Sequence, residues 1–261
     1  MLERSFMELN YKVFGEFGED VIILHGLLGS LDNFQTIARE LSHVYRVWIV
    51  DLRNHGRSPH TEEMSYELMA EDIKEFMKQH NIGHTHIVGH SMGGKVAMSF
   101  ALKYPEMTNH LVVVDIGPKP YEGDHLPYIE AMMTTEASKY TTRKEVEAEI
   151  KKKIRSSWVV QVIMKNLGRD ENKEFIWRPN LQLLYDVYQD IMGSSLGDHT
   201  FSGKTDFIKG AESDYIQEED FNSYKEFFPN AQLHIVENAG HMVHINQPEA
   251  FYHLLLKILG E

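Results

Sequence analysis

The stretch that decides the fold is H-I-V-G-H-S-M-G-G-K-V-A-M, residues 86–98. A β-branched apolar run precedes Ser91 and an Ala/Val/Met-rich run follows it, so a strand is expected to turn directly into a helix at this serine. Such a turn forces a sparsely allowed backbone conformation, and the G-x-S-x-G glycines, Gly89 and Gly93, relieve the crowding. We therefore expect the Ser91 hydroxyl to be exposed at the carboxyl edge of a sheet.

Apolar runs and helical patterns alternate along the rest of the chain. The runs, which are typical of buried parallel strands, are Val21–Leu24, Tyr45–Val50, Ile87–Val88, Leu111–Val114, Phe207–Ile208 and Leu233–Val236. Apolar residues at helical spacing follow Asp32, Ser65, Ser91 and Pro248. This order predicts an α/β protein with a mostly parallel sheet and helices on both faces. Short segments around Phe6–Phe14 and Val21 predict an antiparallel edge hairpin.

Residues 118–200 break the alternation. They contain no clear strand but several helical patterns, one of them opened by a capping-box signature at Thr142 and Glu145. Helices inserted between two strands are expected to form a cap over the edge of the sheet. The expected organisation is a core of residues 1–117 and 201–261 with a helical cap, or lid, of residues 118–200.

Composition excludes several function classes. The formal charge of −13 argues against nucleic acid and anionic membranes as partners. The basic cluster Lys151–Arg155 follows Glu147 and Glu149 and is predicted to form helix-face ion pairs. The absence of cysteine excludes disulfides and thiolate chemistry. No signal-like or membrane-spanning segment is apparent, so a cytoplasmic protein is expected. The sequence does not indicate the oligomeric state.

Two further motifs follow strands that end at the same edge as Ser91. His25-Gly26-Leu27-Leu28-Gly29 comes after the first central strand, and the Leu27 amide is expected to stabilise an oxyanion together with the Met92 amide. His241 follows the last strand and is the expected general base, with His244 as its nearest competitor. An isolated match to G-x-S-x-G would indicate only a helix N-cap serine, and these additional features favour a nucleophile.

The carboxylate that orients the imidazole has more than one candidate. Asp115 ends the run Leu111–Val114 and faces the expected edge, whereas Asp214 and Glu212 lie in the loop after the next strand. A metal site is not indicated, because the histidines His84, His86 and His90 lack the H-x-H-x-D-H pattern. No cofactor is expected.

The motifs together resemble those of α/β-hydrolase fold enzymes over nearly the whole chain. The loop Asp51–Ser58 is similar to the D-x-R-x-x-G-x-S loop of that superfamily, and with residues 91–95 it resembles the small YbfF-type esterases. The resemblance implies an eight-stranded sheet with the cap inserted after the sixth strand. It also favours Asp115 as the acid, since the common G-x-x-D pattern after the seventh strand places Ser213 where that acid would stand.

These features predict a serine esterase that cleaves small acyl esters of short to medium chain length. The triad would be Ser91, His241 and Asp115. An acyl-coenzyme A thioesterase, a carbon–carbon bond hydrolase and a cofactor-free perhydrolase use the same groups, and a ligand receptor that retains the triad is a non-enzymatic alternative. Candidate walls of an acyl pocket, which are equally explained by packing of the cap on the core, are Met132, Met133, Trp158 and Ile163. The basic residues of Lys151–Arg155 could bind a coenzyme A phosphate, but ion pairs with the glutamates of the same helix are the favoured interpretation.

Overall fold

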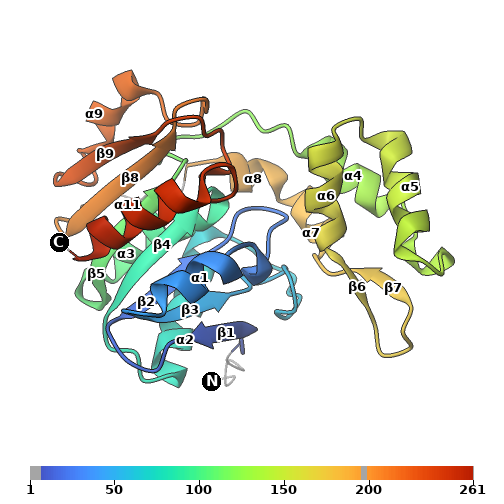
Figure 1. Cartoon of the computed structure of the whole chain (residues 1–261), viewed down its shortest axis with the longest axis horizontal. Coiled ribbons are helices and arrows are strands. Elements are labelled where there is room, and N and C mark those ends of the chain that lie inside the picture. Colours follow the sequence, from blue (N-terminus) through green and yellow to red (C-terminus); the bar gives the residue numbers. More distant parts are fainter. Residues whose placement is uncertain (1–6, 195–198, 261) are drawn as a thin grey trace.

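The protein, represented by a computed structural model that describes residues 7–194 and 199–260, is built on one large sheet (Figure 1). Its strands run in the order β1-β3-β2-β4-β5-β8-β9, and all are parallel except β1. The bounds are β1 Tyr11–Phe14, β2 Asp20–Leu24, β3 Arg46–Val50, β4 Thr85–His90, β5 Thr108–Val114, β8 Lys204–Gly210 and β9 Ala231–Val236.

Five of the six predicted apolar runs lie within strands and the sixth, Tyr45–Val50, does so except for Tyr45, but two details of the predicted sheet are wrong. The described residues form seven strands in this sheet rather than eight, so the inserted region follows the fifth strand along the chain, β5, and not the sixth. The edge hairpin is also absent there: β1 is an antiparallel edge strand, but it pairs with β3, with Tyr11 opposite Val50, and β3 separates it from β2. A local pattern specifies an extended segment without specifying its partner. Phe6 lies outside the described residues.

Helices cover both faces of the sheet, as expected. Val21 and Ile23 of β2 pack on the face covered by α1 Gln35–Leu41, α10 Val243–Asn246 and α11 Pro248–Gly260. Ile22 and Leu24 point to the opposite face, which is covered by α2 Tyr66–Gln79, α3 Met92–Lys103 and α9 Phe221–Tyr224. Successive strand residues alternate between faces, so a fully apolar strand such as β2 requires both layers.

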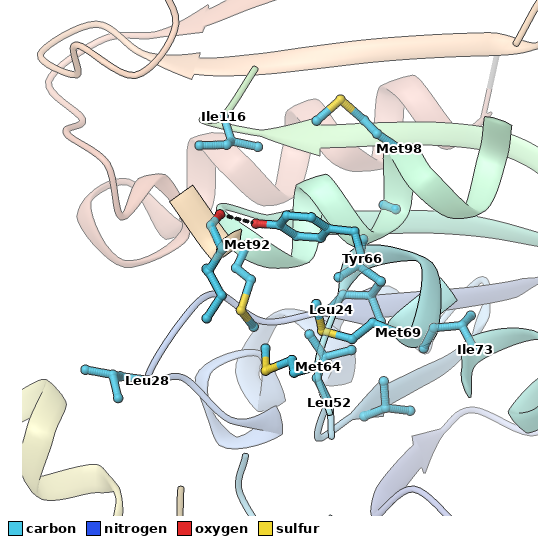
Figure 2. Close-up of a cluster of buried hydrophobic side chains, with 14 of the residues drawn as sticks. Leu24, Leu28, Leu52, Met64, Tyr66, Met69, Ile73, Met92, Met98 and Ile116 are labelled. Carbon is cyan, nitrogen blue, oxygen red and sulfur yellow. Dashed lines mark hydrogen bonds between the residues drawn. The ribbon is translucent and has the colours of Figure 1, made fainter. Parts of the chain in front are cut away.

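The apolar cluster around the start of α3 fixes the position of that helix. Leu24, Met69 and the buried side chain of Met92 lie in this cluster together with the ring of Tyr66 (Figure 2). The Tyr66 hydroxyl donates a hydrogen bond of 2.5 Å to the carbonyl of Ile191 and so ties α2 to the inserted region. The residue that follows Ser91 is therefore anchored in the core.

The inserted region lies to one side of the sheet (Figure 1). It contains α4 Leu126–Met133, α5 Arg143–Lys153, α6 Ser157–Lys165, α7 Leu181–Asp186 and α8 Tyr188–Met192, together with β6 Leu167–Arg169 and β7 Phe175–Trp177. The expectation that this region has no strand is wrong, because β6 and β7 form an antiparallel hairpin. Strands of three residues are too short to show an alternating pattern.

The predicted capping box and one of the two predicted ion pairs form in the inserted region, and the other ion pair does not. The capping box at Thr142 and Glu145 begins α5 as predicted. Lys151 pairs with Glu147 at 2.5 Å. Glu149 pairs with Lys152 at 2.6 Å instead of with Lys153, whose ammonium donates to Thr135 Oγ1 at 2.7 Å. Lys153 bonds a neighbouring segment instead of its own helix, and helix spacing alone does not predict such a contact.

Short 3-10 turns complete the described fold, at Leu31–Asn33, Pro105–Met107, Ala137–Lys139 and Glu218–Asp220. Over residues 7–194 and 199–260, no helix combines the length and the apolar character needed to cross a membrane.

Candidate active site

Ser91 occupies the sharp turn between β4, which ends at His90, and α3, which begins at Met92. Its backbone has φ 54° and ψ −123°, a conformation that L residues rarely adopt. A Cβ atom at Gly89 would lie 2.1 Å from the Gly93 carbonyl oxygen, and one at Gly93 would lie 2.5 Å from the Leu24 carbonyl oxygen. Only glycine fits at either position, which explains the G-x-S-x-G spacing in steric terms.

His241 and Asp115 meet Ser91 at the carboxyl edge of the sheet. His241 lies in the loop after β9, and its Nε2 is 3.0 Å from Ser91 Oγ. Its Nδ1 is 2.8 Å from Oδ2 of Asp115, the residue directly after β5. A neutral imidazole that donates Nδ1–H to this carboxylate leaves Nε2 able to accept the serine proton. The three side chains thus form one hydrogen-bonded chain.

The Asp115 carboxylate is fully buried and receives several hydrogen bonds. Oδ1 accepts from the Gly210 amide at 2.9 Å, and Oδ2 accepts from the hydroxyl of Ser213 as well as from His241. Charge-assisted bonds of this kind compensate the desolvation of a buried charge. Asp214 and Glu212 are exposed, and among the described residues the only carboxylate bonded to His241 is that of Asp115.

The two amides expected to bind an oxyanion lie beside Ser91. Met92 is the first residue of α3, so its amide has no acceptor within the helix. Leu27 lies in a tight turn closed by a 2.9 Å bond from the Gly29 amide to the Gly26 carbonyl, and Leu28 in that turn has φ 55°. Leu27 and Ser91 line the same cavity.

Sequence reasoning missed three neighbours of these groups. The ring of Tyr215 stacks on the His241 imidazole, with centroids 4.0 Å apart and planes 19° apart. His90 Nε2 donates to the His241 carbonyl at 2.9 Å. Ser213 occupies the position at which many family members carry the acid, and its hydroxyl instead donates a hydrogen bond to Asp115. For Tyr215 and His90 the sequence carries no comparable signal.

Several histidines around the site are held neutral. Burial lowers the pKa of His25 to about 4 and the pKa values of His55 and His244 to about 3, and it lowers that of His90 well below the usual value. Both ring nitrogens of His244 are buried without a hydrogen bond, and the ring stacks on Phe34 at 4.4 Å. His244, the competing candidate base, is therefore a packed core residue.

A cavity of about 220 Å³ opens above Ser91. Its core side includes Gly26–Gly29 and His241, and its far side is formed chiefly by α6 through Trp158, Val159, Val162 and Ile163. Tyr128 and Tyr215 also line it. Two of the four apolar residues expected to form its wall, Trp158 and Ile163, are therefore present.

The other two expected wall residues lie elsewhere. Met132 is buried in the core cluster, and Met133 lines a separate surface hollow near Trp177. Helix α4 turns these side chains away from Ser91, an orientation that composition alone does not reveal. The basic segment Lys151–Arg155 does not line the cavity either. In the described part of the chain, no three His, Asp or Glu side chains gather closely enough to hold a metal ion.

Comparison with known proteins shows which fold family this chain resembles. A family model described as the alpha/beta hydrolase fold matches residues 21–146. The sn-1-specific diacylglycerol lipase ABHD11 of Danio rerio is 34% identical, covering 99% of this chain and 84% of its own. Esterase YbfF of Escherichia coli is 31% identical, covering 92% of this chain and 93% of its own. The solved structure of a marine microorganism esterase is 39% identical with a TM-score of 0.93, covering 97% of this chain and 99% of its own.

Proposed function

This chain belongs to the α/β hydrolase fold family, and we propose that it cleaves carboxylic esters through an acyl-enzyme formed on Ser91. It is a carboxylic ester hydrolase of the esterase/lipase class, and the proposal concerns how it performs that reaction. The observation that carries the proposal is the hydrogen-bonded chain from Asp115 through His241 to Ser91, with heavy-atom distances of 2.8 and 3.0 Å. These distances are within the range for proton transfer from a nucleophile to a base.

The first half of the proposed reaction forms the acyl-enzyme. Ser91 Oγ attacks the ester carbonyl carbon while His241 Nε2 takes the hydroxyl proton, and the carbonyl π electrons move to oxygen. The amides of Leu27 and Met92 stabilise that oxyanion. When the tetrahedral intermediate collapses, the C–O bond to the alcohol breaks and His241 returns the proton to the leaving oxygen. The buried Asp115 carboxylate stabilises the transient imidazolium.

The second half repeats the proton transfers with water. His241 accepts a proton from water as the water oxygen attacks the acyl carbon, and the same amides stabilise the second oxyanion. Collapse releases the carboxylic acid and returns the proton to Ser91 Oγ. Because His241 must be neutral to act as a base, the proposal requires activity to fall in acid.

The cavity supports esters with short to medium acyl chains as substrates. Its volume of about 220 Å³ suits a small molecule, and the apolar side chains of α6 suit a hydrocarbon chain. In the same proposal residues 118–200 act as the cap and residues 1–117 and 201–261 act as the catalytic core. Relatives named as a diacylglycerol lipase and as esterases are compatible with this substrate class.

Replacement of the nucleophile tests the proposal. Ser91→Ala is expected to lower kcat on p-nitrophenyl esters of two to sixteen carbons by on the order of 10⁶, since the triad acts as a unit. Ser138→Ala, at an exposed serine of the inserted region, is the matched control and should leave kcat unchanged. A Ser91→Ala variant that retains activity within about tenfold of the native enzyme would exclude Ser91 as the nucleophile. Parallel assays with acyl-coenzyme A separate ester from thioester preference.

A further inference from the structure

A second hollow, of about 170 Å³, lies beside the reaction cavity. Its walls come from the loops after β2 and β3 on the core side, and from the end of α6, β6 and the segment after β7 on the inserted side. The loop after β2 separates the two spaces, because Gly26–Gly29 line the reaction cavity while Ser30–Asp32 line the second hollow. Unlike the reaction cavity, the second hollow is lined mainly by polar and charged side chains.

The carboxylates in this hollow already have partners. Asp32 forms an ion pair with Lys12 at 3.1 Å. Asp51 is buried, and its two oxygens accept hydrogen bonds from the Leu31 amide at 2.8 Å, the Arg57 amide at 2.8 Å and the Asn10 side chain at 2.6 Å. Neither acid forms an ion pair or a hydrogen bond with the side chain of another cation of this hollow.

Three cations that line the same hollow have no such partner. Within residues 7–194 and 199–260, the side chains of Arg57, Lys165 and Arg178 form no hydrogen bond or ion pair. Arg178 is half-buried, and its pKa is lowered by burial and by the neighbouring charge of Arg57, against the weaker opposing effect of the Asp51 and Asp32 charges. In a chain with a net charge of −13, this local excess of unpaired positive charge is the opposite of the molecular average. Arg57 and Lys165 are exposed, so an anion from solution can reach them, and its charge would offset the repulsion between the three cations.

We propose that this hollow binds a phosphate-bearing anion, held by Arg57 and Arg178 with Lys165 as a third cation. Guanidinium groups match phosphate oxygens in bidentate geometry, and an ammonium group adds a point charge. One water molecule needs roughly 10 to 15 Å³ of such space, so a hollow of about 170 Å³ has room for a phosphate or diphosphate group. An acyl chain would find no comparable apolar wall there.

The location gives such an anion a structural consequence. Arg57 belongs to the core, whereas Lys165 and Arg178 belong to the inserted region, so the bound anion would bridge the two. Asn166, which also lines the hollow, donates to the Leu28 carbonyl at 2.8 Å, and Leu28 lines the reaction cavity. The anion site therefore adjoins the loop that carries the proposed oxyanion donor Leu27.

Calorimetric titration of the whole chain with pyrophosphate at low ionic strength tests the site directly. The native chain is expected to bind one equivalent with a Kd of roughly 1 mM or tighter. The double variant Arg57→Gln, Arg178→Gln should bind at least about tenfold more weakly, since it loses two charge-assisted contacts. The control Arg39→Gln removes one exposed charge from α1, outside the hollow, and should bind as the native chain does.

Two results would overturn the proposal. One is the absence of binding to the native chain at pyrophosphate concentrations up to about 10 mM. The other is equal affinity of the native chain and the double variant, with both showing the same melting temperature. If the double variant melts at a lower temperature, the single variants Arg57→Gln and Arg178→Gln are titrated separately, and the same two results apply.

A kinetic comparison identifies the source of the phosphate, and this arm alone depends on the proposed esterase function. Two acyl esters that differ only in a phosphate on the alcohol are assayed with the native enzyme and the double variant. A phosphate carried by the substrate predicts a loss of about tenfold in kcat/KM for the phosphorylated ester alone. A free phosphate ligand predicts equal kcat/KM changes for both esters, with pyrophosphate binding still weakened. Pyrophosphate binding by Ser91→Ala separates failure of the site from failure of the esterase proposal.

Discussion

The two walls of the reaction cavity are built differently. On the core side, Ser91, Asp115 and His241 each follow a strand of one rigid sheet, and the first two have positive φ angles of 54° and 53°. On the opposite side, α6 contributes apolar side chains, and Trp158 remains 44% exposed. The core wall joins its polar groups by hydrogen bonds of 2.8 and 3.0 Å, whereas the α6 wall supplies apolar contact without hydrogen bonds to the reacting groups.

This difference assigns separate tasks to the two walls. Proton transfer depends steeply on distance and needs a preorganised framework, and strand ends provide one. Contact with an acyl chain is less directional and tolerates a wall of short helices. We therefore expect substitutions on the core wall to abolish turnover, and substitutions on the α6 wall to alter the choice of substrate.

Apart from the nucleophile itself, the acid on the core wall gives the largest expected effect. Asp115→Asn should reduce kcat by about 10⁴, because an amide no longer holds the reactive tautomer of His241. Asp214→Asn is the matched control, since Asp214 is exposed and does not bond His241. The measurement is kcat on p-nitrophenyl acetate, with melting temperatures to confirm folding. A large loss in Asp214→Asn with near-native activity in Asp115→Asn would reverse the assignment.

The acid sensitivity of folding should also depend on the core, behind the wall that carries Ser91. Burial lowers the pKa values of His25 to about 4 and of His55 and His244 to about 3, while the unfolded values are near 6.5. Below pH 6.5 the unfolded chain binds protons that the folded chain does not, so stability falls as the pH is lowered. Each histidine contributes about 1.4 kcal/mol per pH unit in that window.

Urea unfolding at pH 7 and pH 5.5 measures this effect. His244→Leu should reduce the difference between the two unfolding free energies by about 1.3 kcal/mol, because it removes one histidine that the folded chain keeps neutral. His84→Asn changes an exposed histidine and should leave the dependence unaltered. An unchanged slope in His244→Leu would show that this residue does not titrate in the expected direction.

Features of the core wall could be predicted where they depend on residues close together in the sequence. The turn at Ser91 was predictable because Gly89 and Gly93 are required by contacts close to the serine. His241 and Asp115 were predictable because parallel strands end at one edge. The partner of β1 and the number of strands were not, since pairing joins segments that no local pattern connects.

The α6 wall was harder to predict for the same reason. Apolar residues of the inserted region pack on the core or line the cavity according to helix orientation, so Met132 and Ile163 were indistinguishable in the sequence. The hairpin of β6 and β7 is too short to leave a pattern. The stacking of Tyr215 on His241 joins two loops separated along the chain, and nothing in the sequence around either residue indicates it.

Substitution of Tyr215 shows whether the ring that stacks on His241 affects turnover, as the core wall does, or substrate choice, as the α6 wall does. Burial raises its pKa to about 12, so it presents a neutral ring to His241. Tyr215→Leu removes the stack and should lower kcat about three- to tenfold with a smaller change in KM, the scale of an aromatic pair. Tyr215→Phe keeps the ring and should retain native kcat. Equal losses in both variants would assign the effect to the hydroxyl instead.

The smallest expected effect lies on the α6 wall. Trp158→Ala should raise KM for medium-chain esters by about threefold and leave p-nitrophenyl acetate unaffected, since only longer chains reach the indole. Tyr185→Ala, a comparably exposed aromatic residue outside the cavity, is the control. A loss of kcat that is equal for all chain lengths would mean that this wall also positions the reacting groups.

The most direct test of the account is labelling with a fluorophosphonate, followed by peptide mass mapping. The account predicts a single adduct on Ser91 in the native chain, strongly slowed labelling in His241→Gln, and native labelling in the control His84→Asn. An adduct on another residue, or undiminished labelling of Ser91 in His241→Gln, would contradict the claim that the sheet edge brings these two side chains together to react.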